Sequence, residues 1–362
     1  MPENPRVLFL YTELAGYTLA CLNALASAGA EVHVVRRPVN KEAPFIFDGG
    51  GKVLFYERSQ LSRTSLLELT EEIQPSLIVV SGWIDKDYLY IARKLRKRGQ
   101  LVLAFDNQWT ASLRQRIAGL VARCSFVRNF DHVWVPGQRQ AEFARKLGFK
   151  AEQIHYGFYS CDSNLYNAYF ESGKAGKEKC FPKRFVFVGR YYEFKGIQDL
   201  WDAFAALQKE KERGWELWCL GTGDITPMQF PGIRHFGFVQ PDQMEQIIKE
   251  SGVFIMPSHF EPWGVAVHEF AAAGFPLLCS DKVGAADAFL NLGINGYIYE
   301  AGDVEGLKNN MRKFTVMPDN QLLEMGRLSH VLSKSISPDS WAQEALSLSR
   351  KSSTANNGNQ KY

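Results

Sequence analysis

The chain has 362 residues, more than one hydrophobic core of ordinary size requires, and this length predicts two domains. A hydrophobic content of 46% and a charged content of 22% exclude a wholly disordered chain. The net charge of +3, without a nucleic-acid-binding motif, argues against a nucleic-acid partner.

The amino-terminal segment and the cysteines predict an intracellular protein. No apolar signal region follows the Met-Pro-Glu-Asn start, and no uninterrupted apolar run approaches the ~18 residues that span a bilayer. The six cysteines show no paired metal-ligand spacing, and four of them lie in apolar runs, which favours buried reduced thiols over disulfides. We therefore expect a cytoplasmic location.

The first half of the chain alternates short apolar strands with helical segments. The run Arg6–Tyr11 predicts a buried parallel strand, and the spacing of Leu19, Leu22 and Ala26 predicts a helix that Gly29 closes. Further strands are expected at 31–35, 76–82, 100–106 and 132–137, with helical segments at 88–99 and 141–148. This order predicts a doubly wound α/β domain over residues 1–165.

The second half repeats this alternation after a break. The segment Phe158–Phe181 is polar, rich in Gly and Lys and without period, which predicts an irregular connection between domains. Strands and helices then resume, and we expect a second doubly wound parallel-sheet domain over residues 166–337. A helix at about 338–350 is expected to pack back on the first domain, and residues 351–362 are expected to form a frayed tail. The predicted fold class is α/β, with two Rossmann-like domains facing a cleft.

Two loops that follow predicted strands of the second domain carry residues suited to a diphosphate. Gly189 and Gly196 flank Arg190 and Lys195, so a guanidinium and an ammonium group stand before a helix N-terminus. A solvated loop is the plain alternative. The segment Gly221–Asp224 either exposes its backbone to a ligand or forms a simple turn. No complete G-x-G-x-x-G follows a strand, which argues against a nicotinamide-dependent dehydrogenase.

The stretch HFEPWGVAVHEFAAAG, residues 259–274, holds two carboxylates eight positions apart. Pro262 and Gly264 interrupt regular helix, so we expect Glu261 on a strand-to-helix loop and Glu269 inside the helix that follows. A helix-capping acid together with a solvated acid is the alternative interpretation of this pair.

These motifs occur in an order that resembles a known family. Over Phe185–Asp303 the succession GR…KG, G-x-G, the two glutamates separated by seven residues and the pair Asn295-Gly296 is similar to the retaining nucleotide-sugar glycosyltransferases called glycosyl transferases group 1. In the first domain the likeness thins to the loop at Gly16, the strand order and the sequence VPG. The resemblance implies the GT-B fold, in which two Rossmann-like domains face each other.

The resemblance also implies roles for individual residues. Arg190, Lys195 and Glu261 would be the catalytic set, with Glu261 meeting the sugar hydroxyls and the two cations stabilising the departing diphosphate. Glu269 would hold the ribose hydroxyls of a UDP- or GDP-linked sugar, and neither a cofactor nor a metal would be needed. The remaining donor-binding residues would be Gly16, Asp106, Gly189, Gly221, Gly223, Phe238, Gly264, Val265 and Ala266, with the last three offering free helix amides to the diphosphate.

The first domain departs from the family pattern in two places. Many relatives carry a His at the end of the fourth strand, where this chain has Asp106, so this contact to the donor sugar differs or passes to Asn107. The Ala15-Gly16 pair is a reduced form of the expected glycine-rich loop. Both departures concern the donor sugar and the rate rather than the class of reaction.

The charge of the chain is concentrated in the first domain. Residues 1–165 hold 21 Lys and Arg against 16 Asp and Glu, a net +5, while the remainder holds 21 against 23, a net −2. The basic segments are Arg93–Gly99 and Ser112–Phe130, with Trp109, Phe126 and Phe130 nearby. They form either an ordinary solvated face or a surface for an anionic membrane that carries a lipid-linked acceptor. The second interpretation adds a peripheral position at the inner membrane face.

One Asp-x-Asp pattern, Asp85 and Asp87, resembles a metal-binding motif but opens a predicted helix. We expect these acids to cap the helix, and we expect transfer to survive EDTA.

The reaction expected from the resemblance is retaining transfer of a sugar to a hydroxyl of a glycan or lipid-linked acceptor, in bacterial-type polysaccharide, lipopolysaccharide or glycolipid assembly. Two alternatives stay open. A sugar-nucleotide isomerase of the same architecture would need an acid/base pair at the sugar C2, and a non-catalytic nucleotide-sugar binder is favoured only by Asp106.

Overall fold

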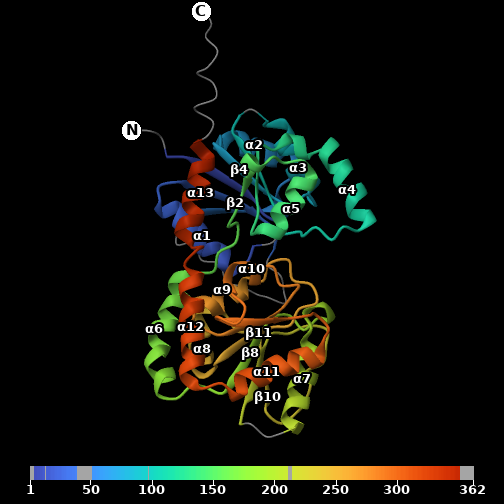
Figure 1. Ribbon diagram of the computed structural model, residues 1–362. Helices are drawn as coiled ribbons and strands as arrows, with labels where there is room; N and C mark the ends of the chain where they lie inside the picture. Colours follow the sequence, from blue (N-terminus) through green and yellow to red (C-terminus); the bar gives the residue numbers. More distant parts are fainter. Residues whose placement is uncertain (1–3, 13, 39–50, 97, 211–213, 351–362) are drawn as a thin grey trace, which may run out of the picture. The chain divides into compact units, whose positions relative to one another are not determined.

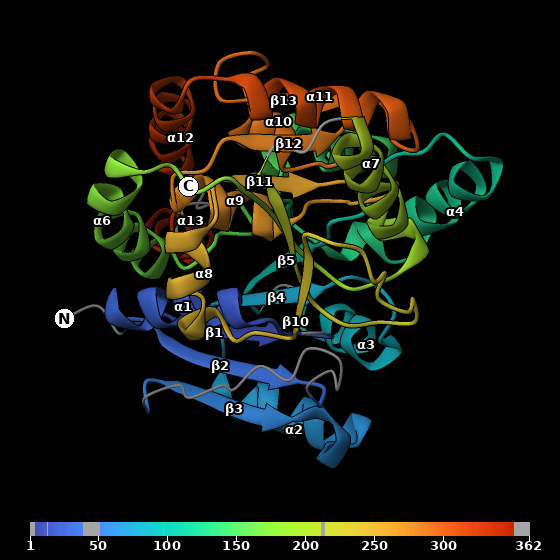
Figure 2. The same cartoon turned by 90° about the horizontal axis from the view of Figure 1, so that it is seen from below.

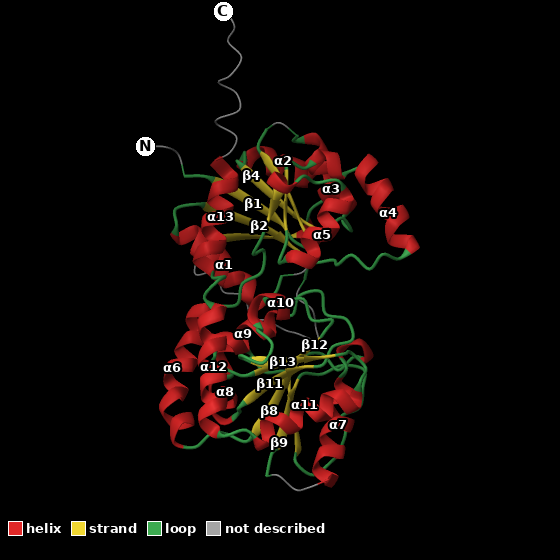
Figure 3. Cartoon of the chain, viewed as in Figure 1, coloured by secondary structure: helices red, strands yellow, loops and turns green. Residues whose placement is uncertain are grey.

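The computed structural model describes residues 4–12, 14–38, 51–96, 98–210 and 214–350, which form two compact units (Figure 1). Unit 1 contains the chain up to Ser160 together with the chain from Ile336 onward, and unit 2 contains Cys161–Ser335. Each unit is a parallel sheet covered by helices, as the colouring by secondary structure shows (Figure 3). The predicted α/β class with two Rossmann-like doubly wound sheets is confirmed.

Unit 1 is built on a seven-stranded parallel sheet with the strand order β3-β2-β1-β4-β5-β6-β7. Its strands are β1 Arg6–Leu10, β2 Glu31–Arg36, β3 Val53–Glu57, β4 Leu77–Ser81, β5 Gln100–Ala104, β6 His132–Trp134 and β7 Ile154–His155. Its α-helices are α1 Gly16–Ser27, α2 Arg63–Ile73, α3 Lys86–Lys94, α4 Leu113–Cys124, α5 Gln138–Leu147 and α13 Pro338–Arg350.

The central strands of unit 1 are apolar on both faces because helices cover both sides of the sheet. In β1, Leu8 and Leu10 belong to the core under α2, α3 and α5, whereas Val7 and Phe9 belong to the core under α1 and α13. This alternation follows from the two-residue period of a strand. It explains why the continuous apolar run in the sequence predicted a fully buried strand.

Unit 2 is built on a six-stranded parallel sheet with the strand order β10-β9-β8-β11-β12-β13. Its strands are β8 Arg184–Val188, β9 Glu216–Leu220, β10 Ile233–Gly237, β11 Val253–Met256, β12 Leu277–Ser280 and β13 Gly296–Tyr299. Its α-helices are α6 Ser163–Lys179, α7 Ile197–Glu210, α8 Glu245–Glu250, α9 Val265–Ala272, α10 Ala286–Phe289, α11 Val304–Val316 and α12 Asp319–Ser333. The helices α7 and α11 pack together on one face, and α6, α9 and α12 pack together on the other.

The segment Phe158–Phe181 corrects the sequence-based expectation, because most of it is the helix α6 rather than an irregular connection. The Asp162 side chain caps the helix by accepting a hydrogen bond from Leu165 N at 3.2 Å. Tyr166, Tyr169, Gly173 and Lys177 are buried, while Lys174, Gly176 and Lys179 are exposed. The helix is stabilised by contacts with α8 and α9, which the local pattern did not show.

The chain returns to unit 1 through α13, which packs against α1. Trp341 stacks on Phe9 and Trp134, with ring centroids 5.5 and 4.8 Å apart, and its indole N–H donates to the carbonyl of Phe158 at 2.8 Å. The boundary between the units lies between Ser160 and Cys161, whereas the sequence suggested a boundary after residue 165. The expected tail at 351–362 lies outside the described residues. Among those residues, no helix has the length and apolarity needed to cross a membrane.

Candidate functional site

The loops that follow β8 and β9 in unit 2 are held together by their backbones. Tyr191 N donates to the carbonyl of Thr222 at 2.8 Å. A Cβ at Gly221 would lie 1.9 Å from the carbonyl oxygen of Gly189, and a Cβ at Gly223 would lie 2.5 Å from that of Tyr191. These glycines therefore permit one loop to lie against the other, which is a structural requirement independent of any ligand.

The loops that follow β8 and β11 bring Lys195 and Glu261 together. His259 N donates to the carbonyl of Phe194 at 2.8 Å, and Gly196, at φ +65°, lies so close to Pro257 that a Cβ would be 2.2 Å from its carbonyl oxygen. Across this contact the Lys195 ammonium forms an ion pair with the Glu261 carboxylate, and both side chains are largely buried. Two of the three predicted catalytic residues are thus directly paired.

The turn from Glu261 to Gly264 is fixed by hydrogen bonds to the segment before α10. The carbonyl of Glu261 accepts from Gly284 N at 3.0 Å, and that of Trp263 accepts from Ala285 N at 2.8 Å. Gly264 has φ +92°, and a Cβ there would lie 2.9 Å from Cγ of Glu261, so glycine is needed at this position. The helix α9 begins at Val265 with no side chain capping its N-terminus.

The second glutamate, Glu269, lies within α9, as the interrupted pattern predicted, and it is partly buried. Burial raises its pKa to about 7; a hydrogen bond with the Tyr166 hydroxyl opposes this shift, and the nearby Asp162 adds to it. Tyr166 lies in α6. Because the sequence predicted an irregular connection at this position, it did not predict the contact with Glu269.

A second side chain that the sequence analysis missed is His268, the neighbour of Glu269. Its Nδ1 accepts a hydrogen bond from the backbone N–H of Cys161 at 3.1 Å, so Nε2 carries the proton and donates to the carbonyl of Ser333 at 2.9 Å. Its ring stacks on Phe289, with centroids 4.1 Å apart. The buried His268 therefore fastens α9 to the first and last segments of unit 2. The signal for this role in the sequence is the presence of a His within an Ala-rich helical segment.

The remaining predicted residues are divided between the units. In unit 2, Arg190 lies on the loop after β8 and Phe238 directly follows β10. In unit 1, Gly16 is the first residue of α1 and Asp106 follows β5. The Tyr159 hydroxyl donates to the Asp106 carboxylate at 3.5 Å, which gives this carboxylate a fixed neighbour.

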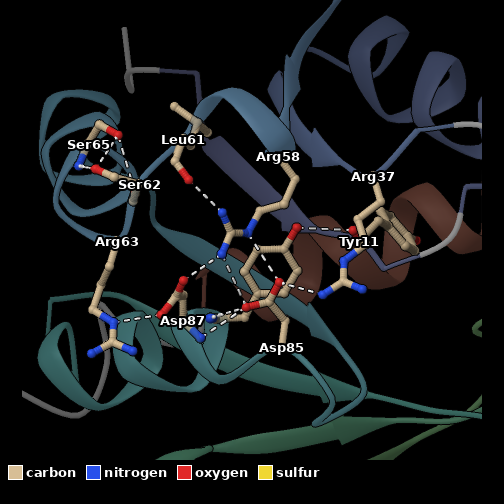
Figure 4. Close-up of polar contacts among 10 residues, drawn as sticks. Tyr11, Arg37, Arg58, Leu61, Ser62, Arg63, Ser65, Asp85 and Asp87 are labelled. Carbon is tan, nitrogen blue, oxygen red and sulfur yellow. Dashed lines mark hydrogen bonds and ion pairs between the residues drawn. The ribbon is translucent and has the colours of Figure 1, made fainter.

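The Asp-x-Asp pair of unit 1 lies in a network of arginines, drawn in Figure 4. Asp85 caps α3 by accepting from Asp87 N at 2.9 Å, and it also accepts from Arg37 at 3.0 Å and from Arg58 at 3.1 Å. Asp87 accepts from Arg58 and Arg63, each at 2.6 Å. Burial alone would raise the pKa of Asp85, but the hydrogen bonds from the two arginines lower it. Both carboxylates are bound by guanidinium groups, and the Asp85 carboxylate is also bound by the helix end.

We compared the chain with known protein families, curated proteins and solved structures. Residues 182–315 match the family model described as Glycosyl transferases group 1. Unit 2 carries a glycosyl transferases group 1 domain. The chain is 33% identical over 124 residues to an uncharacterized glycosyltransferase, MJ1607, of Methanocaldococcus jannaschii, covering 32% of this chain and 31% of that protein. It is 26% identical over 141 residues to a lipopolysaccharide 1,6-galactosyltransferase of Escherichia coli strain K12, covering 36% of this chain and 39% of that protein.

The chain thus spans about a third of the length of the curated relatives that it matches. Across nearly its whole length it is similar to the crystal structure of Anabaena Alr3699/HepE in complex with UDP and glucose, with a TM-score of 0.70 and 15% identity. The match covers 95% of this chain and 99% of that one, and it shows the GT-B fold. The glycosyl transferases group 1 domain coincides with the part of unit 2 that contains Arg190, Lys195, Glu261 and Glu269.

Proposed function

We propose that this chain is a retaining glycosyltransferase that moves a sugar from a nucleotide diphosphate sugar to a hydroxyl acceptor. The observation that carries the proposal is the pairing of Lys195 with Glu261 beside the uncapped N-terminus of α9, inside the glycosyl transferases group 1 domain. A cation and free helix amides suit a diphosphate, and a carboxylate suits sugar hydroxyls.

The donor is proposed to be a UDP- or GDP-linked sugar. The ionised Glu269 carboxylate accepts hydrogen bonds from the two ribose hydroxyls, while the amides of Gly264, Val265 and Ala266 face the diphosphate. The HepE structure, a complex with UDP and glucose, supports a nucleotide-sugar donor. The proposed donor site in unit 2 is completed by Phe238, Gly189, Gly221 and Gly223.

In the proposed reaction the bond between the anomeric carbon and the phosphate oxygen breaks, and negative charge grows on the departing diphosphate. Arg190 and Lys195 stabilise this charge more strongly in the transition state than in the ground state. The acceptor hydroxyl attacks from the same face, its oxygen forms the new bond to the anomeric carbon, and its proton passes to the departing phosphate. Neither a protein nucleophile nor a metal is required in this scheme.

The acceptor is proposed to be a glycan or a lipid-linked saccharide, as in polysaccharide, lipopolysaccharide or glycolipid assembly. The lipopolysaccharide galactosyltransferase among the relatives supports this class, and so does the basic character of unit 1. A cytoplasmic chain that touches the inner membrane face would meet such an acceptor.

The decisive experiment incubates the protein with several nucleotide sugars and no acceptor. Slow hydrolysis of one donor is expected for a transferase, because water replaces the acceptor. Formation of a different sugar nucleotide would instead identify an isomerase. Binding without turnover would identify a non-catalytic binder, and either result would overturn the proposal.

A further inference from the structure

The helix α4 exposes the face that a helix normally buries. Leu113, Ile117, Leu120 and Val121 are 74%, 56%, 66% and 62% exposed, and they supply four of the 14 large hydrophobic side chains that are exposed among the described residues. They recur at i, i+4, i+7 and i+8, the spacing of one apolar stripe, which the exposed Cys124 extends. Figures 1 and 2 both show α4 at the outer edge of unit 1.

The inward side of α4 consists of small residues. Gly119 and Ala122 are buried, and a Cβ at Gly119 would come within 3.9 Å of Leu147 on α5. The helix therefore docks on unit 1 through a glycine and an alanine while its large aliphatic side chains face outward. An amphipathic helix normally buries its apolar stripe, because burial of apolar area is favourable. The exposed stripe of α4 therefore indicates contact with a second surface.

The charges beside the stripe indicate what that surface is. From Asn107 to Phe130 the sequence contains four arginines and no acidic residue. Arg116 and Arg123 are exposed on α4, Arg128 is exposed just after it, and none of them is within ion-pair distance of a carboxylate belonging to a described residue. Arg116 and Arg123 are seven positions apart, so they follow one edge of the aliphatic stripe. A row of guanidinium groups beside aliphatic side chains matches the phosphates and acyl chains of an anionic lipid surface.

The aromatic residues near α4 argue against a protein partner. Trp109 packs against Phe143, with centroids 5.8 Å apart, Phe126 packs against Trp83 at 5.9 Å, and Phe130 is buried. The expected aromatic flank of the basic segment is thus part of the core of unit 1. Protein interfaces are rich in aromatic side chains at their centre, whereas this exposed face is aliphatic and basic.

We propose that the outward face of α4 (Leu113, Ile117, Leu120, Val121 and Cys124, with Arg116 and Arg123) docks on an anionic lipid membrane. This inference deepens the proposed function by naming the surface that would bring a transferase to a lipid-linked acceptor. Membrane binding by α4 does not require turnover, so it can be measured without a donor or an acceptor.

The test measures sedimentation of the full chain with vesicles of phosphatidylcholine alone or of phosphatidylcholine with phosphatidylglycerol. Binding is expected only with the anionic vesicles and should weaken as salt is added. Arg116→Gln with Arg123→Gln should lower partitioning roughly twentyfold, because each arginine near an anionic surface contributes about a fivefold factor. Ile117→Gln, Leu120→Gln and Val121→Gln together should abolish binding while keeping helix propensity. The matched control is Val316→Gln with Val331→Gln, two exposed positions in unit 2, which should leave binding unchanged.

A second readout keeps the test valid if the glutamine variant unfolds. Cys124 and Cys180 are the two exposed thiols, and the other four are buried. An environment-sensitive dye on Cys124, in a Cys180→Ser background, should shift to the blue with anionic vesicles, whereas the dye on Cys180 in a Cys124→Ser background should not. Absence of vesicle binding, binding that survives the triple variant, or an equal response of both dyes would overturn the proposal. Self-association through α4, seen by sedimentation velocity without lipid, would also overturn it. Donor hydrolysis without lipid reports on the proposed function alone.

Discussion

At the scale of single residues, the ion pair between Lys195 and Glu261 links local structure to the proposed chemistry. The glycine at 196 and the backbone contact of His259 with Phe194 bring the two side chains together, although they lie 66 positions apart in the chain. Both side chains are largely buried. Removal of one charge would therefore leave the opposite charge buried without its ion-pair partner, which is energetically costly.

Lys195→Ala should lower kcat more than it weakens donor binding, because the charge of the diphosphate grows as the bond breaks. A charge-assisted hydrogen bond of about 1.5–3 kcal/mol corresponds to a loss of roughly tenfold to a hundredfold in kcat. Steady-state kinetics together with donor binding by calorimetry would measure both quantities. Lys308→Ala, which removes ion pairs with Glu210 and Glu305 in unit 2, is the matched control and should leave both unchanged. Equal losses in kcat and affinity would contradict a transition-state role.

If Glu269 holds the ribose as proposed, its raised pKa should make nucleotide affinity depend on pH. With a pKa of about 7 the carboxyl is mostly protonated at pH 6, and a protonated carboxyl accepts the ribose hydroxyls poorly. Affinity for a free nucleoside diphosphate should therefore fall roughly tenfold between pH 8 and pH 6. The hydrogen bond from Tyr166 lowers this pKa, so Tyr166→Phe should move the midpoint to higher pH. Glu269→Gln corrects for titration of the phosphate, and an unchanged pH profile in this variant would refute the ribose assignment.

The same shift has the opposite effect on stability. The folded-state pKa of Glu269 is above its ordinary value of 4.5, so the folded chain binds more protons than the unfolded chain between about pH 4.5 and pH 7. The contribution of Glu269 to stability is therefore largest below that window and is lost as the pH rises through it. At pH 8 Glu269→Gln should raise the Tm of unit 2 and at the same time weaken nucleotide binding. Thermal unfolding without and with nucleotide would measure both effects.

At the scale of elements, close contacts between loops decide which glycines are indispensable. Gly223→Ala places a Cβ against the backbone of Tyr191, so we expect a loss of about 1–3 kcal/mol and a Tm lower by several degrees. Gly176 is the matched control, because it lies in α6 with nothing within 4 Å of an added Cβ. Gly176→Ala should stabilise the protein by about 0.5–1 kcal/mol through helix propensity. A neutral Gly223→Ala variant would show that the loop adjusts freely.

At the scale of the whole molecule, the chain builds unit 1 from both of its ends. The helix α13 completes the core beneath β1, where Trp341 is almost fully buried between Phe9 and Trp134. Trp341→Ala should destabilise unit 1 by about 3–5 kcal/mol, since it removes both the packing and the hydrogen bond to Phe158. Calorimetry should then show an earlier transition for unit 1 and an unchanged transition for unit 2. An equal shift of both transitions would mean that the units unfold as one.

The sequence by itself determined the alternation of strands and helices, the parallel sheets and the place of Glu261 before a helix and Glu269 inside it. These features depend on periodicity and on residues such as Pro262 and Gly264, which act within a few positions of the chain. The tertiary structure alone decided that α6 is a helix, that Tyr166 and His268 contact α9, and that arginines bind Asp85 and Asp87. It also decided which face of α4 is exposed. The physical reason is that burial and partner choice arise from residues far apart in the chain, which no local pattern specifies.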